Sequence, residues 1–208
     1  VQHMDMNGNS ELAVPQNTLG AELRQLENKQ WEQITLPHTP FVEPLTVLHQ
    51  WQGICYYKKK ITITPEEAKK HIWIEFEGAM HLADVWINGK HVMQHAGGYT
   101  PFVVDATGLL KTDKENELLV RLDNRNNSLI PPGKPLETLD FCYYGGIYRN
   151  VHLIAKADVH ITHPILDGHP AGAGIFITYP KVSQELSVVD AKTEIKNTSD
   201  KEKVVELR

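Results

Sequence analysis

The alternation of apolar and polar side chains is clearest in the stretch HIWIEFE at residues 71–77. In an extended chain, Ile72, Ile74 and Phe76 fall on one face and the acidic side chains on the other, which predicts a strand with one face in the core. The same period of two recurs in six further stretches, at residues 57–64, 83–87, 117–123, 148–154, 174–179 and 188–195. Helical periodicity is almost absent, so the sequence predicts an all-β fold.

Turn residues separate these strands. Asn88-Gly89 lies between two apolar runs and predicts a tight hairpin, because these residues accept the positive backbone dihedrals that such a turn needs. Thr64, Pro65 and Glu67 predict one helical turn, with a capping hydroxyl, a proline at the first helical position and a capping-box glutamate. Short strands at irregular spacing favour a jelly-roll β-sandwich over a simple meander.

The chain divides near residues 156–163, where one strand pattern closes and another begins. We predict a first domain at residues 1–156 and a second, truncated domain at residues 157–208. At most three strands fit into residues 174–208, and a sheet of that size is marginal without a second layer. The length of 208 residues, at roughly 150 per domain, leads to the same expectation.

Composition argues against several partners. The chain carries 21 basic and 26 acidic residues, a formal charge of −5, and no basic stripe that would bind nucleic acid. Its longest apolar runs fall far short of the roughly 18 residues that span a membrane. Cys55 and Cys142 permit at most one disulfide. We therefore expect a chain that binds neither nucleic acid nor membrane.

The eleven histidines include two pairs, His91 with His95 and His160 with His163, at spacings seen in zinc sites. On a strand, however, residues three or four apart do not converge as they do on a helix, and no third ligand is nearby in sequence. We expect no metal site and no cofactor.

The stretch LDFCYYGGIYRNVHL at residues 139–153 is the best candidate for a binding site. Gly145 and Gly146 permit a sharp bend or bulge that turns the preceding Asp140 away from the sheet. The two tyrosines before the glycines, of which Tyr144 is the nearer, offer flat faces that stack on sugar rings. The stretch therefore predicts a carbohydrate-binding corner.

A structural explanation of the same stretch stays open. In that explanation the glycines form a bulge, the aromatic rings belong to the core, and Arg149 pairs with a nearby carboxylate. We expect Arg149 to fasten its strand to the rest of the domain in either case, because an arginine fork commonly satisfies buried carbonyls and carboxylates.

Five motifs follow one another along the chain: LPH at 36–38, FEG at 76–78 with VWING at 85–89, GGYTPF at 97–102, IPPG at 130–133, and GGIYR at 145–149. Together they cover roughly residues 31–155 and resemble the amino-terminal sugar-binding domain of family 2 glycoside hydrolases. This family contains β-galactosidases, β-glucuronidases and β-mannosidases. Each motif alone is weak, whereas five in the family's order are specific.

The resemblance implies a jelly-roll first domain, then an immunoglobulin-like sandwich, then a (β/α)8 barrel with two catalytic glutamates. Residues 157–208 resemble the opening strands of the second of these. A retaining mechanism needs two carboxyl groups about 5 to 5.5 Å apart, and in the family both belong to the barrel. We therefore assign no catalytic residue here and expect this chain alone to be inactive.

The resemblance also implies residue roles. Asp140 matches an acid that contacts the substrate from the first domain, where it would accept hydrogen bonds from the terminal sugar. Asn124 follows the strand at 117–123, close to the loop that faces the active site in the family topology, and we predict a second contact there, although ordinary loop polarity explains it about as well. Met80 stands where some β-galactosidases have a sugar-contacting asparagine.

We accordingly expect the amino-terminal fragment of a β-galactosidase that hydrolyses terminal β-D-galactosides. The alternatives are a β-glucuronidase-like member or a stand-alone carbohydrate-binding module. The expected partners are a terminal β-linked sugar and the chain's own catalytic barrel, and a homo-oligomer of the full-length protein stays open. A periplasmic or secreted location is favoured over a cytoplasmic one, because degraders of external glycans are often exported.

Overall fold

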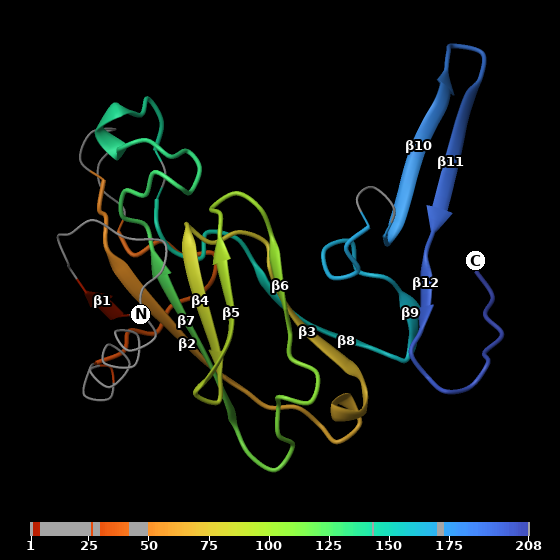
Figure 1. The fold of residues 1–208 in the computed structure, drawn as a ribbon, viewed down its shortest axis with the longest axis horizontal. Coiled ribbons are helices and arrows are strands. Elements are labelled where there is room, and N and C mark those ends of the chain that lie inside the picture. Colours follow the sequence, from red (N-terminus) through yellow and green to blue (C-terminus); the bar gives the residue numbers. More distant parts are fainter. Residues whose placement is uncertain are drawn as a thin grey trace.

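The computed structural model describes residues 2–4, 26, 30–41, 50–142, 144–169 and 173–207, and its regular structure is almost entirely β-strand (Figure 1). One sheet has the strand order β1–β2–β7–β4–β5 and a second has the order β6–β3–β8. The bounds are Gln2–Met4 (β1), Ile54–Ile61 (β2), His71–Phe76 (β3), Leu82–Ile87 (β4), Lys90–Ala96 (β5), Phe102–Asp105 (β6), Asn116–Asp123 (β7) and Val151–Lys156 (β8). The predicted all-β sandwich is confirmed.

The core lies between the two sheets and takes alternate residues from each. Ile72, Ile74 and Phe76 of β3 all point into it, as the alternation predicts. Phe76 stacks on Phe102 with a distance of 4.6 Å between ring centroids. Burial of apolar surface is the main stabilising contribution, at about 25 cal/mol per Å².

Two local predictions are confirmed in the turns. Asn88 and Gly89 have φ values of 52° and 78° and join β4 to β5. The Glu67 amide donates to the Thr64 hydroxyl at 3.2 Å, and the Thr64 amide donates to the Glu67 carboxylate at 2.7 Å, before the short helix η2 (Glu67–Lys69). No helix within the described ranges is long and apolar enough to cross a membrane.

The outer face of the larger sheet differs from the prediction. Alternation in residues 83–87 and 117–123 predicts a solvated outer face, but every residue of β4 is buried, and so is all of β7 except Glu117. Leu26 and Trp31 cover the apolar part of this face. The charged part is buried as a network, in which Arg121 lies 3.6 Å from the carboxylate of Asp84 and 3.4 Å from that of Asp123. Mutual pairing offsets the cost of burying these charges.

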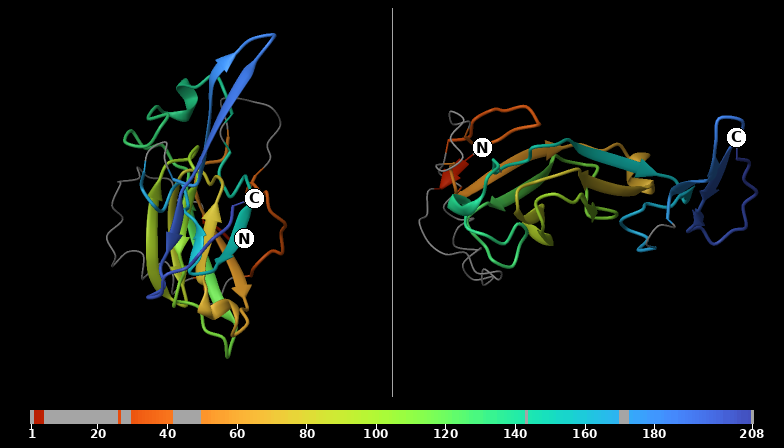
Figure 2. Two further views of the ribbon diagram at one scale, coloured as in Figure 1. Left: turned by 90° about the vertical axis from the view of Figure 1, so that its right-hand side faces the viewer. Right: turned by 90° about the horizontal axis from the view of Figure 1, so that it is seen from above.

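The remaining strands, β9–β12, form what we call the C-terminal module. β9 (Val159–Ile161) pairs with β12 (Ile195–Asn197), and β10 (Ile175–Val182) pairs with β11 (Ser187–Thr193). The single strand expected at 188–195 is therefore two strands, which separate at Glu194 so that β12 can pair with β9. The strand expected at 148–154 begins and ends later, as β8. The module lies at one end of the molecule and β1 at the other (Figure 2).

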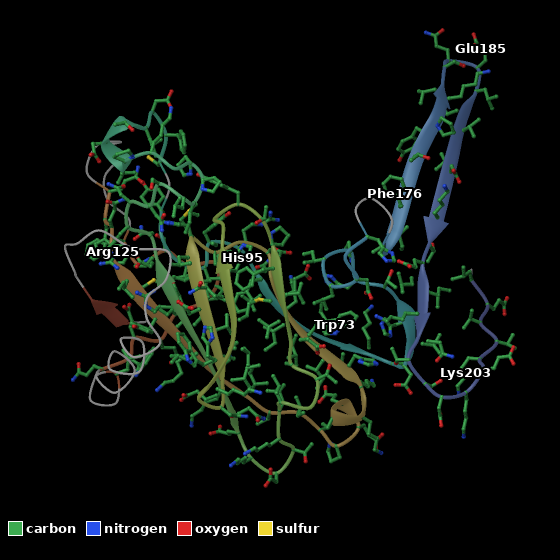
Figure 3. The ribbon with its side chains drawn as sticks, viewed as in Figure 1. Trp73, His95, Arg125, Phe176, Glu185 and Lys203 are labelled. Atoms are coloured by element: carbon green, nitrogen blue, oxygen red, sulfur yellow. The ribbon has the colours of Figure 1, made fainter. Side chains whose placement is uncertain are left out.

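The sandwich and the C-terminal module meet around Trp73 (Figure 3). The rings of His160 and His163 lie edge-on to the indole, with centroid distances of 5.3 and 5.4 Å. A hydrogen bond of 2.7 Å joins His71 to Thr198 across the same junction. Both histidines of this pair therefore pack against an aromatic ring.

Candidate functional site

The corner at Gly146 is fixed by segments that are distant in sequence. Gly146 has a φ of +101°, and a Cβ there would lie 2.6 Å from the Tyr57 hydroxyl and 2.7 Å from the His38 carbonyl oxygen. The Met80 amide donates to the Gly146 carbonyl at 2.9 Å, and the His38 amide donates to the Ile147 carbonyl at 2.8 Å. Only glycine fits this position, on grounds of both conformation and space.

Gly145 lies against Asn124. A Cβ on Gly145 would lie 2.7 Å from the side-chain nitrogen Nδ2 of Asn124. Asn124 is buried, its Oδ1 accepts a hydrogen bond from the Gly53 amide at 2.8 Å, and its Nδ2 donates to the Trp51 carbonyl at 3.0 Å. The side chain thus fastens the segment before β2 to the end of β7. Its predicted contact with sugar stays a prediction.

Asp140 lies on the surface. It follows the short helix η3 (Leu136–Thr138) and the buried Leu139, and its side chain is exposed. It makes no hydrogen bond or ion pair with any residue that the structure describes. A carboxylate without a partner among the described residues keeps its acceptor sites for a ligand. The accessibility that a sugar contact requires is present, and the contact itself stays a prediction.

Tyr144 is half-buried, and Tyr143 lies outside the described residues. Arg149 is largely exposed, with its Nε 3.6 Å from the carboxylate of Glu77, so it links the start of β8 to the end of β3. His152 bonds the other oxygen of Glu77 at 3.2 Å, and this bond lowers the pKa of Glu77 below its usual range. Arg149 thus forms an ion pair with Glu77, and the fastening role that we expect for it stays a prediction.

Met80 is a core residue that joins the candidate site to a neighbouring loop. It is buried with Leu136 and Leu139, and the ring of Tyr148 packs on the cluster. The Tyr148 hydroxyl donates to the Gly98 carbonyl at 2.5 Å, and Gly98 itself leaves no room for a Cβ beside the Met80 sulfur. The residue at position 80 therefore holds the segment before Asp140 in place and is shielded from solvent.

Two exposed aromatic side chains adjoin these residues in sequence, and sequence reasoning did not select them as site residues. Phe141 adjoins Asp140, and Tyr99 adjoins Gly98 in the loop between β5 and β6. Partial burial and the neighbouring Tyr148 raise the pKa of Tyr99. The GGYTPF motif contains Tyr99, but the motif does not show that its ring is exposed beside Tyr148.

His91 and His95, the second pair of histidines, are held by contacts within the fold. His91 bonds the Asp84 carboxylate at 3.0 Å, and the ring of His95 stacks on Phe102. Burial lowers the pKa of His81 to about 4, against the opposing influence of the Asp123 carboxylate. Within the described ranges, no three His, Cys, Asp or Glu side chains group in a way that could hold a metal ion.

A groove of about 940 Å³ lies along the edges of β2 and β8, away from the candidate residues. Its lining residues include Trp31, Ile34, Leu36, Tyr57 and Leu153. Asp140, Tyr144 and Asn124 are not among its lining residues. The exposed carboxylate of Asp140 therefore does not line this groove, although Ile147 of the same stretch does.

Residues 4–157 match the family model described as the sugar-binding domain of glycosyl hydrolases family 2. The chain belongs to this family. A β-glucuronidase of Formosa agariphila is 32% identical over 190 residues, covering 85% of this chain and 19% of the relative. A β-galactosidase of Thermoanaerobacter pseudethanolicus is 32% identical over 192 residues, covering 89% of the chain and 26% of the relative.

The solved structures give the same result for this family 2 chain. A β-glucuronidase of Bacteroides uniformis has a TM-score of 0.68 at 34% identity, covering 81% of the chain and 19% of the solved protein. The chain thus spans about a fifth to a quarter of the proteins that it matches. Its family resemblance is confirmed, and its relatives carry the names of both glucuronidases and galactosidases.

Proposed function

We propose that this family 2 domain presents Asp140 to the terminal sugar in the active site of a larger β-glycosidase. The single observation that carries the proposal is an exposed carboxylate without a partner among the described residues, placed directly after a buried, hydrogen-bonded turn. Hydrogen bonds to a charged acceptor are about twice as strong as neutral ones. The catalytic acid and nucleophile belong, in this proposal, to a barrel outside these residues.

Terminal β-D-galactosides are the substrates that we favour. A neutral sugar offers hydroxyl donors to the Asp140 carboxylate, whereas a glucuronide adds a second carboxylate, and two like charges about 4 Å apart repel each other. A β-glucuronide is the alternative, and it would need a cation from the barrel to offset this repulsion. The names of the relatives support both substrates.

The C-terminal module is, in the same proposal, the start of a second β-sandwich domain at residues 157–208. Ile175, Ile177 and Tyr179 lie on one face of β10, and all three are exposed. An apolar strand face of this kind suits coverage by further strands of the same sandwich. Export to the periplasm or beyond and homo-oligomerisation of the full-length protein remain proposals.

The test is the substitution of Asp140 in the full-length protein. Asp140→Ala should lower kcat/KM for an aryl β-galactoside about 100-fold, which is roughly 3 kcal/mol of transition-state binding. Asp190→Ala, at an exposed acid of the C-terminal module, is the matched control and should have no effect. Running the same variants on an aryl β-glucuronide distinguishes the two substrates. An unchanged kcat/KM in Asp140→Ala removes this residue from the site.

A stand-alone carbohydrate-binding module is the competing hypothesis. Titration of the 208-residue chain with galactose and with β-galactoside oligosaccharides, followed by amide NMR shifts, should show at most millimolar binding if the site needs the barrel. Saturable binding at micromolar concentrations would support the module instead. Hydrolysis of nitrophenyl glycosides by the 208-residue chain at enzyme-like rates would contradict both hypotheses, the domain that needs a barrel and the stand-alone module.

A further inference from the structure

The three asparagines after β7 all bond to backbone groups of other residues. Asn124 bonds the segment before β2, as described above. The Oδ1 of Asn127 accepts a hydrogen bond from the Leu129 amide at 2.9 Å. The Oδ1 of Asn126 accepts two hydrogen bonds, one from the Leu136 amide at 2.9 Å and one from the Gln52 side chain at 2.8 Å. Asn124 and Asn126 therefore connect segments that are distant in sequence, whereas the bond of Asn127 is local.

The bond from Asn126 matters because of where Leu136 lies. Leu136 is the first residue of η3, and the first amides of a helical turn have no partner within it. Leu136 is also buried, so water is a poor substitute for that partner. The Asn126 oxygen, held from its other side by Gln52, thus satisfies the amide at which the turn begins.

Asp140 follows η3 directly after its C-cap residue, Leu139. The Leu139 amide donates to the Leu136 carbonyl at 3.0 Å, which closes the turn. Leu136 and Leu139 are both buried against Met80, so the turn has little freedom to shift. The exposed carboxylate is therefore carried on a turn that the Asn126 oxygen caps at its start and that packs on Met80.

We propose that Asn126, supported by Gln52, is a positioning residue that sets the Asp140 carboxylate at the sugar. This inference rests on the proposed function of Asp140. Asn126 acts only through Asp140, and its own side-chain oxygen is occupied by the Leu136 amide and Gln52. A misplacement of about 1 Å at a binding group can cost up to about 100-fold in rate.

A double-mutant cycle in the full-length protein tests the proposal. Asn126→Ala should lower kcat/KM for the aryl glycoside about tenfold or more, and Asn126→Asp, which keeps an acceptor oxygen, should restore most of it. Added to Asp140→Ala, Asn126→Ala should have no further effect, because there is no carboxylate left to misplace. Asn197→Ala, at an asparagine that bonds the backbone in the C-terminal module, is the matched control.

The outcomes separate the two hypotheses. If Asp140→Ala leaves kcat/KM unchanged, the proposed function fails. If Asp140→Ala impairs the enzyme but Asn126→Ala is neutral, or lowers kcat/KM equally with and without Asp140, the positioning role alone is wrong. Should Asn126→Ala not fold, Gln52→Leu takes its place in the cycle, because it removes the donor that holds the Asn126 oxygen beside the Leu136 amide. Gln52→Leu should lower kcat/KM when Asp140 is present and have no effect in Asp140→Ala. A neutral or an additive effect of Gln52→Leu would overturn the proposal.

Discussion

The sandwich and the C-terminal module are built from the same alternating pattern, but they bury it differently. In the sandwich, Phe76 and Val85 are fully buried between two sheets. In the module, Ile175 and Tyr179 are 60% and 63% exposed, because β10 and β11 form a two-stranded sheet with no second layer in the described residues. The comparison shows that alternation specifies a strand and its apolar face, and that burial depends on what covers that face.

Charged residues show the same contrast. Arg121 of β7 is completely buried between two carboxylates, whereas Asp190 and Lys192 of β11 are exposed. A buried charge depends on its partners, and an exposed one is screened by water. Substitutions should therefore have large effects in the sandwich and small ones in the module.

The largest difference in stability between the two parts is expected for a pair of aromatic truncations. Phe76→Ala should lower the free energy of unfolding by about 3 to 5 kcal/mol, because it removes a buried ring and leaves a cavity beside Phe102. Tyr179→Ala, at an exposed ring of the module, should change it by less than about 0.5 kcal/mol. Urea unfolding followed by tryptophan fluorescence measures both. Equal losses would mean that the module is as well packed as the sandwich.

The second-largest loss of stability is expected when the buried arginine is removed. Arg121→Met keeps much of the side-chain volume but leaves the carboxylate of Asp84 without its arginine, and the expected loss is about 3 to 4 kcal/mol. Lys192→Met in the module is the control and should be nearly neutral. Thermal unfolding by circular dichroism gives both values. A stable Arg121→Met variant would show that the network contributes little to the sandwich.

The pH dependence of the sandwich should follow His81. Burial lowers the pKa of His81 from 6.5 to about 4, so the folded chain takes up the proton less readily than the unfolded chain. The native state therefore has its full stability above the unfolded pKa of 6.5, and it loses stability as the pH falls from there toward the folded pKa of about 4. From about pH 7 to about pH 5, the free energy of unfolding should fall by about 2 kcal/mol from this residue. Urea titrations at both values measure the loss.

The variant His81→Asn is the comparison for this pH effect. It should be less stable than the parent chain at neutral pH, but it should lose distinctly less stability on acidification. The same slope in both proteins would assign the pH dependence to other groups.

The most local expected effect concerns the junction between the two parts. Trp73→Ala removes the buried indole on which His160 and His163 pack, contacts that are worth about 0.5 to 1.5 kcal/mol each beyond the burial of the indole itself. Amide hydrogen exchange should accelerate in β9 and β12 and stay slow in the core strands of the sandwich. Leu153→Ala, at an exposed position of β8, is the control. Unchanged exchange in β9 would show that strand pairing alone holds the module.

Sequence reasoning predicted features that depend on neighbouring residues. The face that Ile72, Ile74 and Phe76 share, the Asn88-Gly89 turn, and the reciprocal bonds of Thr64 and Glu67 are all local and are all present. The family resemblance, carried by five short motifs, is confirmed over residues 4–157.

Features that depend on distant segments were missed. Nothing near Asp84 or Arg121 in the sequence shows that their sheet face is covered, because the cover comes from residues such as Trp31. The Asn126 oxygen is likewise used by Leu136 and Gln52, which only the folded chain brings to it. For the candidate site, sequence and resemblance selected Asp140, and the fold adds its exposure and its supports.

The corner at Gly146 has a consequence for the order in which the chain folds. Its neighbours include Tyr57, whose hydroxyl bonds the amide of Ile147 across 90 residues of chain. Contacts between such remote segments form slowly, because the intervening loop must first be closed. We expect local hairpins such as β4–β5 to assemble early and this corner to assemble late, so that a partly folded chain would have strands before it has the candidate site.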